Sequence, residues 1–281
     1  YSKEMKLRLI TFIAATMTAL YAFAQHGEGK SNIAQLTSKD TLQSYKNMRL
    51  VWSDEFNGNK LDTISWNRCE RAKKQWSGHM SPADTVCRIS NGTLKLYGIR
   101  TPPELNDTLP CITGGINSKG KRSIRFGRVD VRARIEGGKG FWPAIWLIPD
   151  SNIAWPRGGE IDIMEHLNHD PEIHQTVHTY LTWKGLEKPA KNHSTTPVEP
   201  AEFNLYSVEL TPEKIEFFVN GKSSHVYERQ KPDIENQFPF PGNPFYIILS
   251  AQLGGDWVGE IDLNDLPVLM EIDYVRFYEK R

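Results

Sequence analysis

The chain has 281 residues, of which 39% are hydrophobic and 24% charged, so it is long enough to bury a sizeable core as a soluble globular protein. Its 34 Lys and Arg residues balance its 34 Asp and Glu residues. A formal net charge of zero argues against a protein that binds nucleic acid or a membrane surface through a basic patch.

Residues 1–24 have the three parts of a secretory signal peptide. Two basic residues precede an apolar run, and Ala22 and Ala24 then form a cleavage pattern of small residues. The apolar run is shorter than a membrane span, so a transmembrane anchor is the weaker interpretation. We therefore expect the residues before Met5 to be vestigial. We expect the mature protein to be exported to the periplasm or beyond the cell, with no membrane insertion after cleavage.

Residues 25–46 are rich in Gly, Ser, Thr, Gln and Lys and show little apolar periodicity, which is typical of a flexible lead-in. Ordered structure is expected to begin near Leu50. Export to an oxidising compartment would permit one disulfide among the three cysteines. The sequence does not decide the pair, and we favour Cys69–Cys87 over a bond to Cys111.

The rest of the chain is predicted to be all-β. In residues 128–135 charged and apolar side chains alternate, so one face should enter a core and the other should face water. Residues 215–219 run into an Asn-Gly hairpin turn, residues 245–249 suit a strand buried on both sides, and residues 271–278 alternate again. Many short strands without intervening helices indicate a sandwich or barrel.

The most informative stretch is residues 158–166, GGEIDIMEH. Glu160 and Asp162 alternate with isoleucines, so a strand would carry both carboxylates on one face. Glu165 has the wrong parity for that face. A β-bulge near residues 163–164 would return it to the carboxylate face, where the three acids would line a cleft.

Three carboxylates on one face repel one another and raise at least one pKa. Glycoside hydrolysis gives such an arrangement a purpose, because it uses a carboxylate nucleophile and a carboxylic acid. Tryptophans surround the stretch, and aromatic rings pack against the C–H faces of sugars. The candidate sugar platforms are Trp142, Trp146, Trp155 and Trp257. Trp142 and Trp146 are four residues apart and would share one strand face.

With GEIDIME preceded by WPAIW, and with the later GGDW and IDYVRFY, the sequence resembles glycoside hydrolase family 16, and its laminarinase group in particular. The resemblance covers residues from about 50 to the C-terminus, within a catalytic domain that we place at residues 47–281. It implies a jelly-roll β-sandwich of two antiparallel sheets with a concave substrate cleft. The segment 66–80 departs from the laminarinase pattern, and Arg68 within it is a further candidate substrate contact.

The resemblance implies that Glu160 is the nucleophile of a retaining mechanism, Glu165 the acid/base and Asp162 the residue that tunes the nucleophile. A flat strand would separate the two glutamates by ~13 Å, so the sheet must curve to bring them to the ~5–5.5 Å of a retaining pair. His178 would lie in the cleft on the neighbouring strand. The resemblance also implies a structural calcium, with Asp273 and the carbonyl of Gly92 as candidate ligands, and no cofactor for catalysis.

Four histidines fall close together in the sequence, at positions 166, 169, 174 and 178. Their spacing matches no closed zinc pattern, and no cysteine joins them, so a zinc site is the weaker interpretation.

Three functions remain open on the sequence. The first is a retaining endo-β-glycosidase acting on a polysaccharide, a β-1,3-glucan or a mixed-linkage β-1,3-1,4-glucan. The second is an endo-β-galactosidase acting on mucin-type O-glycans or on algal galactan. The third is a lectin without catalysis, which would have no need of three acids on one face. We expect a monomer.

Overall fold

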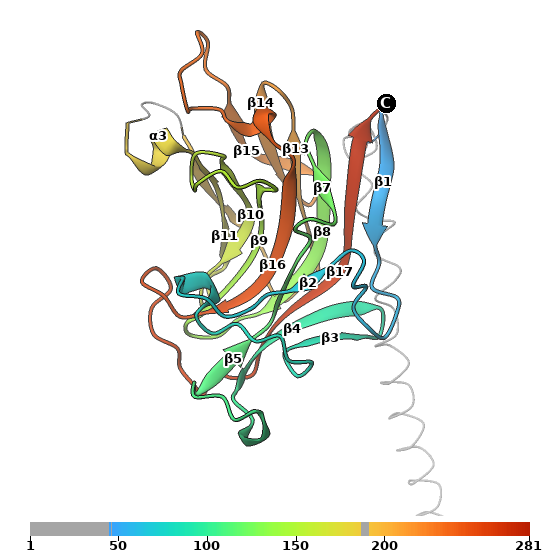
Figure 1. Ribbon diagram of the computed structural model, residues 1–281, viewed down its shortest axis with the longest axis vertical. Helices are drawn as coiled ribbons and strands as arrows, with labels where there is room; N and C mark the ends of the chain where they lie inside the picture. Colours follow the sequence, from blue (N-terminus) through green and yellow to red (C-terminus); the bar gives the residue numbers. More distant parts are fainter. Residues whose placement is uncertain (1–44, 46, 187–190) are drawn as a thin grey trace, which may run out of the picture. The chain divides into compact units, whose positions relative to one another are not determined.

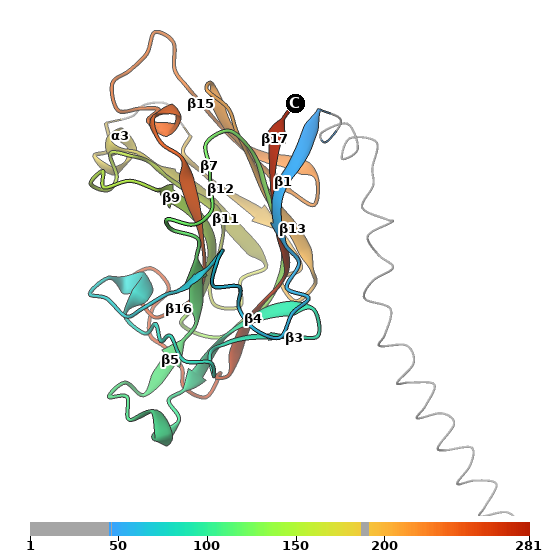
Figure 2. The same ribbon diagram turned by 45° about the vertical axis from the view of Figure 1, so that its right-hand side comes forward.

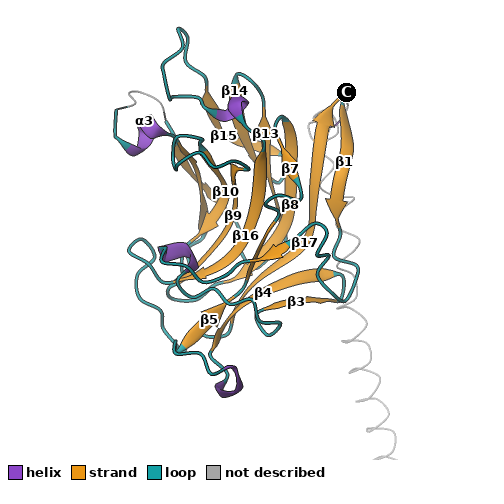
Figure 3. Ribbon diagram, viewed as in Figure 1, coloured by secondary structure: helices purple, strands orange, loops and turns teal. Residues whose placement is uncertain are grey.

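The computed structural model describes residue 45, residues 47–186 and residues 191–281. The predicted signal peptide, and the lead-in apart from Tyr45, lie outside the described residues. The described chain forms two antiparallel sheets packed face to face, with the helical pieces confined to loops (Figures 1 and 3). The predicted all-β jelly-roll sandwich is confirmed.

The larger sheet has the strand order β15-β14-β13-β8-β17-β4-β3, and β1 pairs with β17 while β5 pairs with β4. Its strands are β1 (Met48–Asp54), β3 (Cys87–Ser90), β4 (Thr93–Arg100), β5 (Cys111–Thr113), β8 (Gly127–Glu136), β13 (Asn204–Leu210), β14 (Lys214–Val219), β15 (Lys222–Glu228) and β17 (Val268–Lys280).

The smaller sheet has the order β12-β11-β10-β9-β16-β6-β2, and β7 pairs with β16. Its strands are β2 (Asn67–Arg68), β6 (Gly115–Asn117), β7 (Ser123–Ile124), β9 (Phe141–Pro149), β10 (Glu160–His166), β11 (Glu172–His178), β12 (His193–Pro197) and β16 (Phe245–Leu253). The long strands of this sheet are bent. Figure 1 shows β9, β10, β11 and β16 curving together, and Figure 2 shows β9, β11 and β16 from a second side.

The helical pieces are short: η3 (Gln75–Ser77), η4 (Pro103–Leu105), α3 (Tyr180–Trp183) and η5 (Phe240–Gly242). Within the described ranges, no helix has the length and apolar character needed to cross a membrane.

One apolar core fills the space between the two sheets. The inward residues of β10, Ile161 and Ile163, are both fully buried in it, as the alternation predicts. Strand β16 is buried along its whole length, as predicted for residues 245–249. The Asn-Gly prediction is also confirmed, because Asn220 and Gly221 both take positive φ, 52° and 78°, in the two-residue turn between β14 and β15.

The outer face of β8 corrects the sequence analysis. We expected its charged side chains to face water, but Arg128 and Asp130 are buried, at 0% and 2% exposure. They form an ion pair at 2.7 Å, and the Arg128 guanidinium lies 4.6 Å from the centre of the Phe218 ring. Alternation therefore gives the parity of the strand correctly, but it does not reveal that another segment covers the polar face.

Tyr45 forms part of that cover. Its hydroxyl donates a hydrogen bond to Asp130, and its ring centre lies 5.0 Å from the Arg128 guanidinium. Tyr45, which falls within the predicted flexible lead-in at residues 25–46, thus packs on the outer face of the larger sheet.

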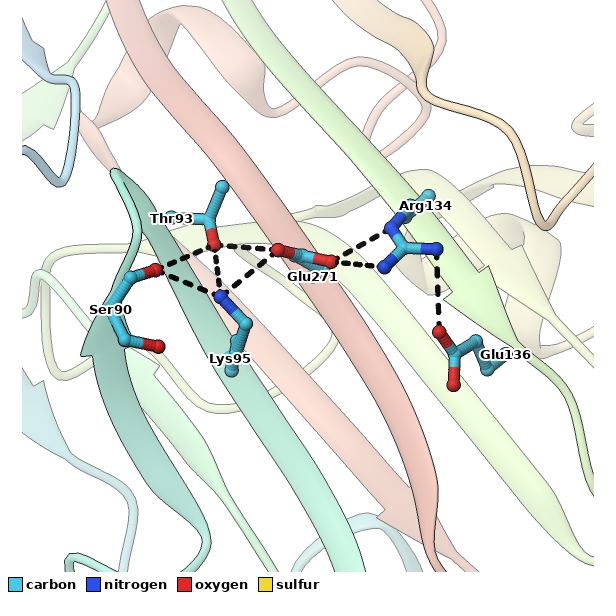
Figure 4. Close-up of polar contacts among 6 residues, drawn as sticks. All are labelled: Ser90, Thr93, Lys95, Arg134, Glu136 and Glu271. Atoms are coloured by element: carbon cyan, nitrogen blue, oxygen red, sulfur yellow. Dashed lines mark hydrogen bonds and ion pairs between the residues drawn. The ribbon is translucent and has the colours of Figure 1, made fainter. Parts of the chain in front are cut away.

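A second polar group on the outer side of this sheet ties four strands together (Figure 4). Glu271 of β17 accepts hydrogen bonds from Thr93 of β4 at 2.6 Å and from Arg134 of β8 at 2.7 Å. Lys95 lies 3.0 Å from the same carboxylate and donates to the Ser90 carbonyl at the end of β3. Burial alone would raise the pKa of Glu271, but these contacts outweigh it and hold the pKa below its usual value.

The expected disulfide between Cys69 and Cys87 is wrong: Cys69, Cys87 and Cys111 are all free and buried. Cys87 and Cys111 lie in the core between the sheets, whereas Cys69 packs with Met80 and Trp146 on the other face of the smaller sheet. Burial raises the pKa of the Cys69 thiol to about 12.

The buried Arg128–Asp130 pair gives a test of the outer face. We expect Asp130→Ala to lower the free energy of unfolding by roughly 3–5 kcal/mol, because it leaves a buried guanidinium without its counter-charge. Breaking the exposed pair Arg49–Glu279 with Arg49→Ala is the control, and it should change stability by about 1 kcal/mol or less. Urea unfolding measures the free energy of unfolding of both variants. Similar losses in the two would contradict the role given to the buried ion pair.

Candidate active site

The three acids lie on β10, and a bulge brings them to one face. In the pairing with β11, Asp162 lies opposite Thr176, yet the next pair joins Glu165 to His174. In the pairing with β9, Asp162 lies opposite Trp146 and Met164 opposite Ile145. The register therefore shifts just after Asp162, as predicted, and Glu165 regains the face of Glu160 and Asp162.

The two glycines before β10 let the chain enter the strand in a crowded place. Gly159 has a positive φ of 86°, and a Cβ atom there would lie 2.6 Å from the Phe240 ring. No other residue meets both conditions without strain, so the glycine sets how Glu160 is presented to the cleft.

All three acids line a cavity of about 490 Å³ on the curved face of the smaller sheet. Its floor comes from β9, β10 and β16, and one wall comes from the segment that contains η3. The lining residues also include Lys74, Trp76, Lys119, Trp142, Trp146, Trp155, Tyr246 and Gln252.

Each terminal acid of the row has its own indole donor. The Trp155 indole donates to Glu160 Oε2 at 2.7 Å, and the Trp142 indole donates to Glu165 Oε1 at 2.9 Å. Trp155 is half-exposed, so one acid is bonded from the rim, while Trp142 bonds the other from within the sheet. These two bonds fix the directions in which the carboxylates point.

His178 lies beside the end of the row that Glu160 occupies. It pairs with Glu160 across the β10–β11 ladder, and its Nε2 is 3.2 Å from Asp162 Oδ2 and 4.0 Å from Glu160 Oε1. His178 thus lies on the neighbouring strand beside the acids, and its contact with substrate stays a prediction.

The electrostatics differ along the row. Burial, together with the neighbouring charge of Asp162, raises the pKa of Glu160 to about 8, while His178, the Trp155 indole and Lys74 oppose the rise. Burial also raises the pKa of Asp162. Burial, then the charge of Asp162, raises the pKa of Glu165 well above its ordinary value. Because Glu160 alone has Lys74 among these stabilising groups, it is the better site for a negative charge.

The four predicted tryptophans all lie near the acids, but with different burial. Trp146 is buried, and its indole donates to Ser250 at 3.1 Å, so it forms part of the floor. Trp257 is 45% exposed and packs edge-on against Trp142, with the ring centres 5.5 Å apart.

Sequence reasoning missed several residues of the cleft. Trp76 lies edge-on against Trp146, with the ring centres 5.1 Å apart, and it comes from the segment that departs from the family pattern. Tyr246 and Gln252 come from β16, where Gln252 pairs with Trp142. Positions 246 and 252 are an even number of residues apart, so the sequence does indicate that both side chains lie on one face of the strand. Because the strand is apolar on both faces, the sequence does not indicate which face borders the cleft.

Arg68 does not line the cleft. Its guanidinium donates to the carbonyls of Ala83 and Cys87 and pairs with Asp84 at 2.5 Å, in a separate hollow of about 1020 Å³ between β2 and β3. The prediction that Arg68 contacts substrate is therefore corrected: it holds the loop that precedes β3.

The residues proposed for calcium do not fit that ion well. Asp273 pairs with the Arg132 guanidinium at 2.7 Å, which places a positive charge where the cation would lie. Gly92 lies in the turn after β3 with a φ of 74°. The structural calcium stays a prediction, and no step of the chemistry depends on it.

The four histidines do not form a common zinc site. His166 contacts the carbonyl of Asp170, His169 contacts Asp265, and His174 contacts His193 at 3.1 Å. His178 contacts Asp162 at 3.2 Å, so each of the four rings has a partner of its own.

The raised pKa of Glu160 predicts a dependence of stability on pH. A carboxyl whose pKa is higher in the folded than in the unfolded state destabilises the fold once it ionises. The penalty is absent below the ordinary value of 4.5 and grows as the pH rises towards 8. We expect Glu160→Gln to match the wild type in melting temperature at about pH 4 and to exceed it at about pH 9.

The matched control is Glu104→Gln, which changes an exposed glutamate outside the cleft. Its difference from the wild type should stay constant over the same range. A Glu160→Gln variant that gained no stability at the higher pH would contradict the assigned environment of Glu160.

Comparisons with known proteins agree with this geometry. The family model of glycosyl hydrolases family 16 matches residues 104–276, a range that includes all three acids. The keratan-sulfate endo-1,4-beta-galactosidase of Sphingobacterium multivorum is 31% identical over 99% of this chain and 68% of that protein. The beta-glucanase of Rhodothermus marinus is 31% identical over 86% of this chain and 89% of that protein.

Among solved structures, one reported with endo-acting O-glycanases of the human gut microbiota that initiate mucin breakdown has a TM-score of 0.71. It is 32% identical and covers 81% of this chain and 98% of that chain. A curved antiparallel sheet, a bulged row of three acids and a family model that matches more than half of the sequence lead to one conclusion. The chain belongs to glycosyl hydrolases family 16 and is a glycoside hydrolase.

Proposed function

We propose that this chain is a retaining endo-β-glycosidase in which Glu160 is the nucleophile and Glu165 the acid/base. The observation that supports this assignment best is the bulge after Asp162, which places both glutamates on the wall of one cavity. The open cleft suits an internal bond of a glycan chain.

In the first step the Glu160 carboxylate attacks the anomeric carbon, while Glu165 gives its proton to the leaving oxygen. A covalent glycosyl ester forms, and the glycosidic bond breaks. In the second step Glu165, now a carboxylate, takes a proton from water as the water oxygen attacks the same carbon and releases Glu160.

The surroundings suit these roles. Burial keeps Glu165 protonated until the leaving oxygen approaches, and its Trp142 partner holds it in place. Asp162, buried between the two glutamates, acts through its charge on both. Ester formation neutralises Glu160, which removes one negative neighbour from Glu165 and favours its service as a base.

Two substrate classes remain, and a specific observation favours each. The beta-glucanase relative supports a β-1,3-glucan or a mixed-linkage β-glucan. The keratan-sulfate galactosidase relative aligns with nearly the whole chain, which supports a glycan with internal β-galactosidic bonds. The wall that carries Lys74 and Trp76 comes from the segment that departs from the laminarinase pattern, so we place the galactosidic glycan first.

Substrate choice is tested by product analysis after incubation with keratan sulfate, mucin O-glycans, agarose, laminarin and lichenan. We expect oligosaccharides from keratan sulfate or mucin O-glycans, because of the divergent cleft wall. Release from laminarin or lichenan alone would restore the glucan as the substrate.

Glu160→Gln should abolish turnover and leave glycan binding in place, because it removes the nucleophilic charge while preserving side-chain volume. Activity and affinity are measured on the best substrate of the panel, with Glu104→Gln as the control. Near-normal turnover in the Glu160→Gln variant would exclude Glu160 as the nucleophile.

The stereochemistry of the product tests the paired glutamates. Proton NMR of the earliest product from a β-linked substrate should show the β-anomer, because two displacements at one carbon restore its configuration. Initial release of the α-anomer would mean a single displacement, and the pairing of Glu160 with Glu165 would have to be abandoned.

A further inference from the structure

The exposed tryptophans of this chain gather around the row of acids. All eight tryptophans belong to the described residues, and the three with the largest exposure are Trp155 at 51%, Trp183 at 52% and Trp257 at 45%. Trp155 bonds Glu160, and Trp257 packs against Trp142, which bonds Glu165. Trp183 is the member of this group to which nothing above gives a role.

Trp183 ends the short helix α3, which follows β11 directly. Its ring lies edge-on to Trp155, with the centres 6.0 Å apart and the planes at 72°. The Trp155 ring centre is in turn 6.1 Å from that of His178. A continuous line of rings thus leads from Trp155, which lines the 490 Å³ cavity beside Glu160, out to Trp183 on α3.

The helix has no need of an exposed Trp183 for its own stability. A capping box between Thr179 and Thr182 already satisfies the start of the helix. Exposed aromatic faces that gather beside a glycosidase cleft, as those of Trp155 and Trp183 do, suit the C–H faces of sugars.

Two cations accompany the rings. The Lys184 ammonium lies 4.2 Å from the centre of the Trp183 ring, and the Arg157 guanidinium lies 4.1 Å from the centre of Tyr180. Within the described ranges, neither side chain has a carboxylate within ion-pair distance. Cations that lie on aromatic faces beside a glycan cleft are suited to a sugar that carries a negative group.

We propose that Trp155 and Trp183 form an outer subsite that stacks a sugar ring of the same glycan chain, and that Arg157 and Lys184 make this subsite prefer a sulfated or carboxylated unit. This inference rests on the proposed function, because the subsite serves a glycan that passes over the acids. It adds a requirement for length and for charge that the row of acids does not itself impose.

The test measures binding rather than turnover. Keratan sulfate oligosaccharides of two lengths, and the same oligosaccharides after chemical desulfation, are titrated calorimetrically against the Glu160→Gln chain. Adding Trp183→Ala should weaken binding of the long sulfated oligosaccharide by about tenfold and leave the short one unchanged. Trp183→Phe, which keeps an aromatic face, should retain most of the affinity.

Adding Arg157→Gln and Lys184→Gln should reduce the affinity for the sulfated oligosaccharide and leave that for the desulfated one unchanged, and raised salt should reproduce the effect. Lys222→Gln, at the start of β15 in the other sheet, is the matched control and should change neither affinity.

The results that would overturn the inference are distinct from those that would overturn the function. The stacking subsite would be rejected if Trp183→Ala left the affinity unchanged. It would also be rejected if the variant lost equal affinity for both lengths and had a lower melting temperature. The preference for a negative group would be rejected if the charge variants changed the affinities for sulfated and desulfated oligosaccharides equally.

Failure of the wild type to cleave keratan sulfate, with cleavage of laminarin instead, would reject the galactosidic substrate and the charge preference together. The stacking subsite is then decided by the same comparison of Trp183→Ala on short and long laminarin oligosaccharides in the Glu160→Gln chain. If Trp183→Ala left the affinity for the long laminarin oligosaccharide unchanged, the stacking subsite would be rejected as well.

Discussion

The structure depends on one costly arrangement, three carboxyl groups buried side by side on β10. Water would stabilise each of them as an anion, and burial removes that water, so the pKa of Glu160, Asp162 and Glu165 all rise. The packing of the neighbouring strands on both sides of β10 offsets this loss of stability. The isoleucines that alternate with the acids enter the core between the sheets, and β9 and β11 hold the bulge from either side. Stability in the core therefore supports a strained polar face.

The two sheets differ in how completely their buried charges are compensated. The larger sheet carries its own buried charges on its outer face, in the Arg128–Asp130 pair and around Glu271, and there each charge has a partner. On the curved face of the smaller sheet the charges of the acids are left only partly compensated, by indole donors and by His178. Opposite charges thus lie beside one another on one side of the molecule, and the only partly compensated acids on the other side are available for chemistry.

The residue pattern predicted the main strands, a sandwich or barrel, the bulge and the row of acids, because alternation and parity are local properties of the chain. The resemblance to the family narrowed the fold to a jelly-roll sandwich. Sequence reasoning failed where the answer depends on which segments meet. The cover over Arg128, the free state of Cys69 and the place of Arg68 all follow from packing between distant segments. Gln252 was missed because the pairing of β16 with β9 decides which residues face the cleft, and Trp76 was missed because its loop meets Trp146 only in the folded chain. Local pattern thus identifies the reacting groups, and the tertiary fold decides the groups that surround them.

The two indole bonds have a spectroscopic consequence. Trp142 donates to one terminal acid and Trp155 to the other, so each carboxyl group has its own fluorophore in hydrogen-bond contact. The emission of an indole responds to the charge of the group that accepts its hydrogen bond. Because the chain has eight tryptophans, the signal of one acid is the difference in emission between the wild type and a variant in which phenylalanine replaces the indole that bonds that acid. The site therefore contains a means to follow its two proton equilibria separately during a titration, without any added label.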